Sequence, residues 1–305
     1  MKKPDATKNS FLLFVSAGLA VMIIFFPPAK TTAPQGDVLG VTYQQLPIAQ
    51  DITPRRQAGT PDFETPAHAV YAIDLRSKKI LFEKAARTPW KPASLTKLMT
   101  ALVAVNSASL DQIIQIEPED TRVPAPRMGL VAGEKISVEN LLKGMLVASA
   151  NDAALALARG IGGTQAEFVR LMNAMVKQLD LKSTNFKNPH GFDEVGQYST
   201  AEDLAKLTLE FLRHSELASM VQIQKDVVRS EDGKIRHWLT TTNILLNRED
   251  VLGVKTGYTE EARGNLIILF SDKNQNQILT VVLGSEHRES ESERFIDWIR
   301  KSYEF

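Results

Sequence analysis

The 305-residue sequence contains no cysteine, which excludes disulfide cross-links, thiolate catalysis and zinc sites built on cysteine. Its 36 basic and 36 acidic residues balance, so the chain lacks the overall positive field that attracts nucleic acid. The five histidines are scattered, and no two of them have the spacing of a helical metal site. The sequence therefore predicts no metal, no other cofactor and no nucleic-acid partner.

An apolar run covers residues 11–26, with lysines before it and Pro27-Pro28 directly after it. This layout is typical of an export signal, so we expect everything beyond it to lie outside the cytoplasm. The run exceeds the roughly 7–15 residues of a cleavable signal core. We therefore favour an uncleaved membrane anchor over a cleaved signal peptide and assign residues 1–28 to this element.

Residues 29–66 are rich in Pro, Thr, Gln and Ala and show little hydrophobic periodicity. That composition is typical of a flexible linker. A folded domain is predicted over residues 67–305, beginning with two short β-favouring runs at 69–75 and 79–83 that indicate a hairpin.

The middle of the chain carries helix signals, and its last part carries strand signals. Pro92 precedes a helix expected to open at Ser94, and Ser137 is a candidate helix cap. Capping boxes are predicted at Thr164 with Glu167 and at Ser199 with Glu202. Strands are expected at 251–256, 265–271 and 278–284, followed by a closing helix at 289–303. This order predicts an α+β fold, with an antiparallel sheet whose first and last strands come from opposite chain ends and an inserted all-helical subdomain.

Three short motifs occur in order: Ser94-Leu-Thr-Lys97, Ser149-Ala-Asn151 and Lys255-Thr-Gly257. Together they form the set found in penicillin-recognising enzymes with an active-site serine. Each motif alone is weak evidence, and Ser183-Thr-Asn185 repeats the form of the second one. Because Ser183 stands in a polar turn and Ser149 lies between apolar helices, we favour Ser149.

The first motif has a physical basis for nucleophilic catalysis. Residues three apart on a helix share a face, so the Lys97 amine can reach the Ser94 hydroxyl. A lysine among apolar neighbours is desolvated, which favours the neutral amine and makes it a plausible base. The alternative is a helix cap followed by a surface lysine; the presence of all three motifs favours catalysis.

The third motif lies in a predicted strand, where Lys255 and Thr256 point to opposite faces and Gly257 leaves room for a substrate backbone. An ordinary strand end with a turn glycine is the alternative. The sequence resembles the penicillin-binding D-alanyl-D-alanine carboxypeptidases of the low-molecular-mass serine type over about residues 67–303. The stretches that carry the resemblance are 90–100, 147–154, 188–192, 198–203, 242–246 and 254–259.

The resemblance implies a β-lactamase/transpeptidase-like fold and an acyl-enzyme mechanism on peptidoglycan stem peptides, with β-lactams as covalent inhibitors. It implies that Ser94 attacks the penultimate D-alanine carbonyl and that Lys97 accepts its proton. Ser149 and Asn151 would relay protons and hold the substrate amide. The substrate-binding residues that it implies are Lys255, Thr256, Gly257 and Tyr258, with the backbone N–H groups of Ser94 and Tyr258 as the oxyanion hole.

The sequence departs from the family pattern in several places, and other functions remain as alternatives. Many relatives carry a second, β-rich domain and a C-terminal anchor, in whose place we expect the N-terminal run to act. Arg263 and the segment Arg122–Arg127 depart from the family pattern and bear on substrate preference. We interpret His190 as a structural turn residue and Arg236 as a solvated surface residue.

The alternative functions are a β-lactamase, a D,D-endopeptidase on peptidoglycan cross-links and a catalytically silent penicillin-binding wall module.

Overall fold

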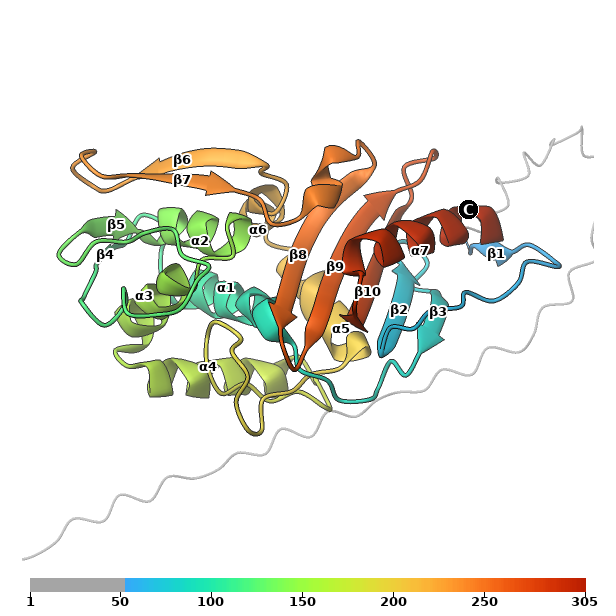
Figure 1. The fold of residues 1–305 in the computed structure, drawn as a ribbon, viewed down its shortest axis with the longest axis horizontal. Helices are drawn as coiled ribbons and strands as arrows, with labels where there is room; N and C mark the ends of the chain where they lie inside the picture. The colour runs from blue at the N-terminus through green and yellow to red at the C-terminus, as the bar shows by residue number, and fades with distance from the viewer. Residues whose placement is uncertain (1–52) are drawn as a thin grey trace, which may run out of the picture. The chain divides into compact units, whose positions relative to one another are not determined.

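The computed structural model describes residues 53–305, and its centre is a five-stranded antiparallel sheet in the order β3-β2-β10-β9-β8 (Figure 1). β2, near the start of the chain, pairs along its whole length with β10, near the end. The predicted joining of the two chain ends in one sheet is therefore confirmed. The strands are β2 (Ala69–Asp74), β3 (Ile80–Lys84), β8 (Val251–Thr259), β9 (Arg263–Ser271) and β10 (Gln277–Ser285).

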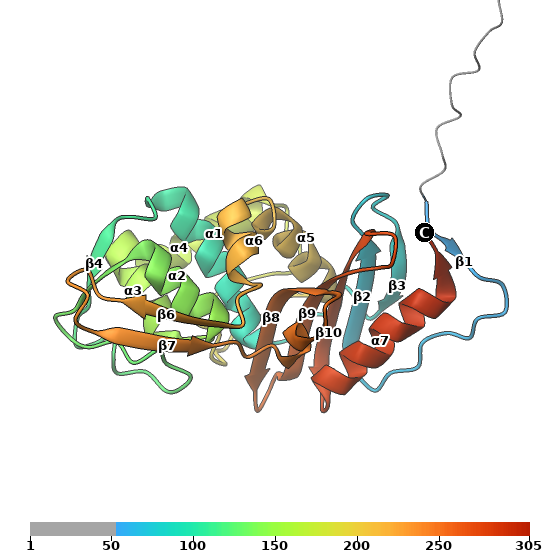
Figure 2. The ribbon, with the colours of Figure 1, turned by 90° about the horizontal axis from the view of Figure 1, so that it is seen from above.

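Helices cover both faces of this sheet. α7 lies across one face, against β9 and β10, and α5 packs on the other face, against β2 and β10 (Figure 2). Because helices cover both faces, side chains on both sides of β9 and β10 are buried. The sequences of these strands are therefore nearly continuous apolar runs, without the alternation of a half-exposed strand. The two helices are α5 (Ala201–Phe211) and α7 (Arg288–Ser302).

A helical subdomain fills the middle of the chain, as expected, around the buried helix α1. The Ser137 side chain caps α2 by accepting from the Asn140 N–H, and Thr164 caps α4 by accepting from the Glu167 N–H. Both predicted caps are confirmed. The subdomain comprises α1 (Thr96–Ser107), α2 (Val138–Val147), α3 (Asn151–Gly162), α4 (Gln165–Gln178) and α6 (Ser215–Met220).

The predicted capping box at Ser199 is wrong by one residue. Thr200 caps α5, and its hydroxyl accepts from the Asp203 N–H at 3.1 Å. Ser199 is held elsewhere, because its N–H and carbonyl bond to the backbone of Trp90 and its hydroxyl to Thr184. The pairing with Trp90, which is remote in sequence, therefore decides which of two adjacent hydroxyl residues becomes the cap.

Two small two-stranded sheets lie outside the main sheet, and neither was predicted from the sequence. β6 and β7 form a hairpin that lies over α2 and runs away from β8 (Figures 1 and 2). β4 pairs with β5 at the far end of the helical subdomain. Their bounds are β4 (Ile113–Gln115), β5 (Lys135–Ser137), β6 (Lys225–Arg229) and β7 (Arg236–Thr240).

The folded region reaches further toward the N-terminus than Ala67. β1 (Arg55–Arg56) pairs with β11 (Tyr303–Glu304), and Phe63 is buried against Phe295 of α7. Among residues 53–305 no helix is both long enough and apolar enough to cross a membrane. The expected anchor and most of the expected linker lie outside the described residues.

Candidate active site

Ser94 lies in a short 3-10 turn, η1 (Ala93–Leu95), which leads directly into α1. The helix thus begins two residues later than the sequence suggested. The expected geometry still forms, because the Lys97 Nζ lies 2.9 Å from the Ser94 Oγ. A hydroxyl and an amine at this distance can exchange a proton directly.

Lys97 is fully buried, and its amine has two further contacts. Its Nζ donates to the Asn151 Oδ1 at 2.7 Å and to the His190 carbonyl at 2.7 Å. Burial lowers the pKa of Lys97 well below 10.5, and the charge of Lys255 lowers it further, while Asp152 acts in the opposite direction. The site therefore favours a neutral amine.

Ser149 lies in the connection between α2 and α3, and Asn151 is the first residue of α3. The loop that contains Pro124 and Pro126 holds Asn151 in place. The Asn151 N–H donates to the Pro126 carbonyl at 2.8 Å, and its Nδ2 donates to the Pro124 carbonyl at 3.0 Å. Asp152 accepts from three successive N–H groups of the same loop, beginning at Met128. The segment Arg122–Arg127, which departs from the family pattern, therefore positions Asn151 through its backbone carbonyls.

The competing motif at Ser183 lies elsewhere in the structure. Both the N–H and the side-chain amide of Asn185 bond to a neighbouring loop, at Tyr198 and Gly196. The Ser183 N–H donates to Asp203 of α5. The structure therefore brings Ser149 and Asn151, and not Ser183 and Asn185, into contact with Lys97 and Lys255.

Lys255 lies on β8, opposite Ser94, and is also fully buried. Its Nζ donates to the Ser149 Oγ at 2.8 Å. Burial, with a contribution from the charge of Arg288, lowers the pKa of Lys255 to about 7. The next residue, Thr256, places its Oγ1 2.6 Å from the Thr242 Oγ1.

Two glycines allow the backbone to approach the Ser94 turn closely. A Cβ on Gly257 would lie 3.1 Å from the Ser94 nitrogen, so any side chain there would push β8 away from η1. A Cβ on Gly191 would lie 2.0 Å from the Ala93 carbonyl oxygen, and the φ of Gly191 is +98°. Tyr258, which follows Gly257, keeps its side chain exposed.

Arg288, at the start of α7, was not predicted from the sequence. Its guanidinium donates to the Gly257 carbonyl at 2.8 Å and fixes the strand that carries Lys255. Nothing local in the sequence signals this contact, because the two residues are 31 positions apart. The buried His190 ring accepts from the Phe192 N–H, and burial together with Lys97 lowers its pKa to about 3. His190 thus contacts the turn through its ring and Lys97 through its carbonyl, and Arg236 is exposed on β7.

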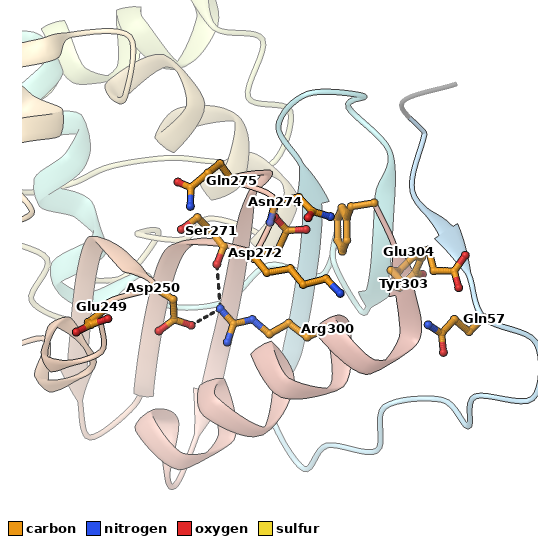
Figure 3. Close-up of a pocket in the computed structure, with 12 residues that line it drawn as sticks. Gln57, Glu249, Asp250, Ser271, Asp272, Asn274, Gln275, Arg300, Tyr303 and Glu304 are labelled. Carbon is orange, nitrogen blue, oxygen red and sulfur yellow. Dashed lines mark hydrogen bonds and ion pairs between the residues drawn. The ribbon is translucent and has the colours of Figure 1, made fainter. Parts of the chain in front are cut away.

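A cavity near the end of α7 lies away from this site. It measures about 800 Å³ and lies between the end of α7 and the turn joining β9 to β10 (Figure 3). Arg300 projects into it and pairs with Asp250. None of the eight predicted site residues lines it, so this cavity is separate from the candidate active site.

Comparisons with known proteins agree with the resemblance found in the sequence. The family model for D-alanyl-D-alanine carboxypeptidases matches residues 55–287. The carboxypeptidase DacF of Bacillus subtilis is 34% identical over 247 residues, which are 78% of this chain and 63% of DacF. The carboxypeptidase DacC of Escherichia coli is 33% identical over 246 residues, which are 76% of this chain and 60% of DacC. The chain thus spans about three fifths of the length of these two relatives.

Solved structures support the same assignment. The carboxypeptidase DacD of Francisella tularensis superposes with a TM-score of 0.73 at 28% identity, covering 78% of this chain and 71% of that one. A Streptomyces DD-transpeptidase superposes with a TM-score of 0.73 at 27% identity, covering 78% of this chain and 98% of that one. The predicted fold class is confirmed, and the chain belongs to the D-alanyl-D-alanine carboxypeptidase family.

Proposed function

We propose that the protein is a serine D-alanyl-D-alanine carboxypeptidase that removes the terminal D-alanine from peptidoglycan stem pentapeptides. The observation that carries the proposal is the 2.9 Å approach of the buried Lys97 amine to the Ser94 hydroxyl. Lys255 on β8, with its Nζ 2.8 Å from the Ser149 Oγ, supplies a second amine near the nucleophile. Membership of the carboxypeptidase family supports the same activity.

Acylation is explained by the hydrogen bonds of a neutral Lys97. The amine donates to Asn151 and to the His190 carbonyl, so its lone pair is left to accept the Ser94 proton. The Ser94 oxygen attacks the penultimate carbonyl carbon, and the resulting oxyanion is stabilised by the N–H groups of Ser94 and Tyr258. The C–N bond then breaks, and the proton passes from Lys97, through Ser149, to the leaving amine. Water later hydrolyses the ester and restores the hydroxyl.

Recognition of the terminal carboxylate is assigned to Lys255 and Thr256. A pKa of about 7 leaves Lys255 close to half-protonated in the empty site at neutral pH. A bound carboxylate favours the charged amine, so substrate binding completes the protonation. Thr256 can donate to the same carboxylate while Thr242 holds its oxygen from the other side.

Endopeptidase activity on cross-linked peptides is the second candidate. A D-alanyl-D-alanine endopeptidase of Haemophilus influenzae is 31% identical over 220 residues, which are 71% of this chain and 74% of that protein. The share of that protein covered exceeds the shares of DacF and DacC. The two activities use the same nucleophile and differ in the leaving group beyond the scissile bond.

β-Lactams are proposed as covalent inhibitors that acylate Ser94. A β-lactamase would need a base to hydrolyse that ester, typically in a Glu-x-x-x-Asn loop. Between Asn151 and Lys255 no glutamate has an asparagine four positions later. We therefore expect the penicilloyl ester to persist.

We place the enzyme outside the cytoplasm, in peptidoglycan synthesis and the maintenance of cell shape, and tethered to the membrane by residues 11–26. The placement rests on the charge and hydropathy of the sequence. Peptidoglycan, as substrate, lies in the same compartment. Mass spectrometry of the membrane-extracted protein would report the mature N-terminus, and loss of the first 28 residues would refute the anchor.

The activity is tested by incubating the protein with a stem pentapeptide and with a cross-linked dimer. We expect D-alanine release from the pentapeptide, no release with Ser94→Ala, and slower cleavage of the dimer. Faster cleavage of the dimer would establish the endopeptidase instead. Stoichiometric labelling of Ser94 by penicillin without any D-alanine release would establish the silent wall module, and rapid loss of the label would establish a β-lactamase.

A further inference from the structure

The β6–β7 hairpin presents one face to solvent, and that face carries an exposed tryptophan. Trp238 is 75% exposed and lies directly opposite Val227 in the strand pairing. The pairs on either side of it on the same face are Arg229 with Arg236 and Lys225 with Thr240. Indole rings are usually buried, and they are among the commonest anchors where proteins bind other molecules.

The inner face of the same hairpin is firmly attached to the body of the protein. His237 and Leu239, on either side of Trp238 in the sequence, are 3% and 2% exposed. The His237 Nε2 lies 2.6 Å from the Glu134 Oε1, and its Nδ1 lies 3.2 Å from the Met128 carbonyl. The exposure of Trp238 is therefore a property of a fixed strand and not of a loose end.

The charges on the outer face have one sign. Lys225, Arg229 and Arg236 are exposed, and none of them forms an ion pair with another residue of the described region. The acidic residue of β6, Asp226, alternates to the inner side, where its carboxylate lies 3.9 Å from the Lys143 amine of α2. These cations around an aromatic ring suit a ligand that has carboxylates and an apolar face.

This face leads directly into the active site. Beyond β7 the chain reaches Thr242, whose N–H donates to the Val147 carbonyl and whose hydroxyl contacts Thr256. At about 3.3 Å per residue, the four residues back to Trp238 span about 13 Å. Figure 2 shows the hairpin running from the β8 edge along the helical subdomain. A substrate seated with its carboxylate at Lys255 can therefore extend along this face.

From these observations we infer that the outer face of the β6–β7 hairpin is a substrate subsite for the part of peptidoglycan remote from the scissile bond. Trp238 stacks on the sugar that carries the stem peptide, and Lys225, which pairs with Thr240 on the side nearer Thr242, binds a carboxylate of that peptide. The inference rests on the proposed function, since it assumes that a stem peptide occupies the cleft. It makes Trp238 and Lys225 determinants of specificity, outside the catalytic machinery.

The experiment compares a short and a long substrate. Trp238→Ala is assayed on an N-acyl-D-alanyl-D-alanine dipeptide and on a disaccharide pentapeptide, with Ile80→Ala, an exposed apolar residue on the distant strand β3, as the matched control. We expect kcat/KM to fall about tenfold on the disaccharide pentapeptide only. Lys225→Gln is expected to give a similar fall, which disappears when the carboxylates of the peptide are amidated.

Equal losses on both substrates, or none on either, would overturn the subsite. Binding of the disaccharide pentapeptide to Ser94→Ala, measured by calorimetry with and without Trp238→Ala, separates this inference from the proposed function. If the wild-type protein releases no D-alanine but binding still depends on Trp238, the proposed activity fails and the subsite stands. If D-alanine is released but binding does not depend on Trp238, the subsite is refuted and the proposed activity stands.

Discussion

Two buried regions of the molecule contain different kinds of side chain. Around Ser94 the interior holds two lysines and an asparagine, and each of their side chains has a hydrogen-bond partner. Beneath α7 the interior is made of aromatic rings, with Phe295 packed 4.7 Å from Phe63 and 5.4 Å from Phe82 between ring centroids. Burial lowers lysine pKa values in the first region, while in the second it supplies stability. Substitutions in the two regions should therefore have separable effects.

Replacing Lys97 should give the largest effect on chemistry. In Lys97→Met the Ser94 proton has no acceptor, so we expect acylation by penicillin to slow by about a thousandfold or more. The free energy of unfolding should change by only about 1 kcal/mol, because two effects oppose each other: Asn151 and the His190 carbonyl lose a donor, while the cost of burying a lysine with a lowered pKa is removed. Stopped-flow labelling and urea denaturation measure the two quantities.

Lys273→Met, at an exposed turn, is the matched control and should leave both quantities unchanged. Acylation of Lys97→Met at the wild-type rate would contradict the role of the amine. A collapse of stability would instead make Lys97 a structural residue, like those beneath α7.

Phe295→Ala should show the reverse pattern. Phe295 is fully buried, so truncation should lower the free energy of unfolding by about 3–5 kcal/mol. The acylation rate of the folded protein should stay near the wild-type value, since the ring does not contact the cleft. A loss of acylation at a temperature where circular dichroism shows the variant to be folded would mean that the two regions are coupled, and would contradict the separable effects expected here.

Arg288 belongs to α7 but contacts β8, the strand that carries Lys255. In Arg288→Met the Gly257 carbonyl loses its donor, and we expect KM to rise about tenfold. Because the guanidinium also lowers the pKa of Lys255, its removal should raise that pKa above about 7. The charged amine binds the carboxylate, so the pH at which affinity is lost should move upward.

The control on the same helix is Arg294→Met, whose guanidinium lies 5.6 Å from the Phe63 ring and away from the cleft. It should leave the pH profile of 1/KM unchanged. If Arg288→Met moved that profile downward or not at all, the electrostatic link between α7 and Lys255 would be refuted.

The smallest effect is expected at Arg263, which begins β9 with a φ of +56°. A residue with a side chain is strained in this left-handed region, which accounts for the small residue expected there from the family pattern. Arg263→Gly should raise the free energy of unfolding by about 0.5 kcal/mol, since the larger entropy of the unfolded glycine offsets part of the relief. Urea denaturation measures this change, and a destabilisation would contradict it.

The sequence was sufficient for the parts of the molecule that depend on local pattern. The strands β8, β9 and β10 fall where the apolar runs predict them, each two or three residues longer. Ser94 and Lys97 meet because helical spacing dictates it, and the caps at Ser137 and Thr164 arise from local chemistry.

Contacts between distant segments could not be predicted in this way. The β6–β7 hairpin was missed because its strands are short and charged, and its inner face is defined by contacts with Glu134 and Met128. Arg288 and the Pro124–Pro126 loop act on the site through backbone carbonyls, which carry no signature in the sequence. Ser199 was mistaken for a cap because its pairing with Trp90 is a tertiary contact.

The pH dependence of Ser94 acylation tests the central assignment most directly. If a neutral Lys97 is the base, the rate of penicillin labelling should fall as pH decreases through the lowered pKa of that lysine, with a midpoint well below 10.5. The label should map to Ser94 by mass spectrometry at every pH. A midpoint near 10.5, or a label on another residue, would contradict the account.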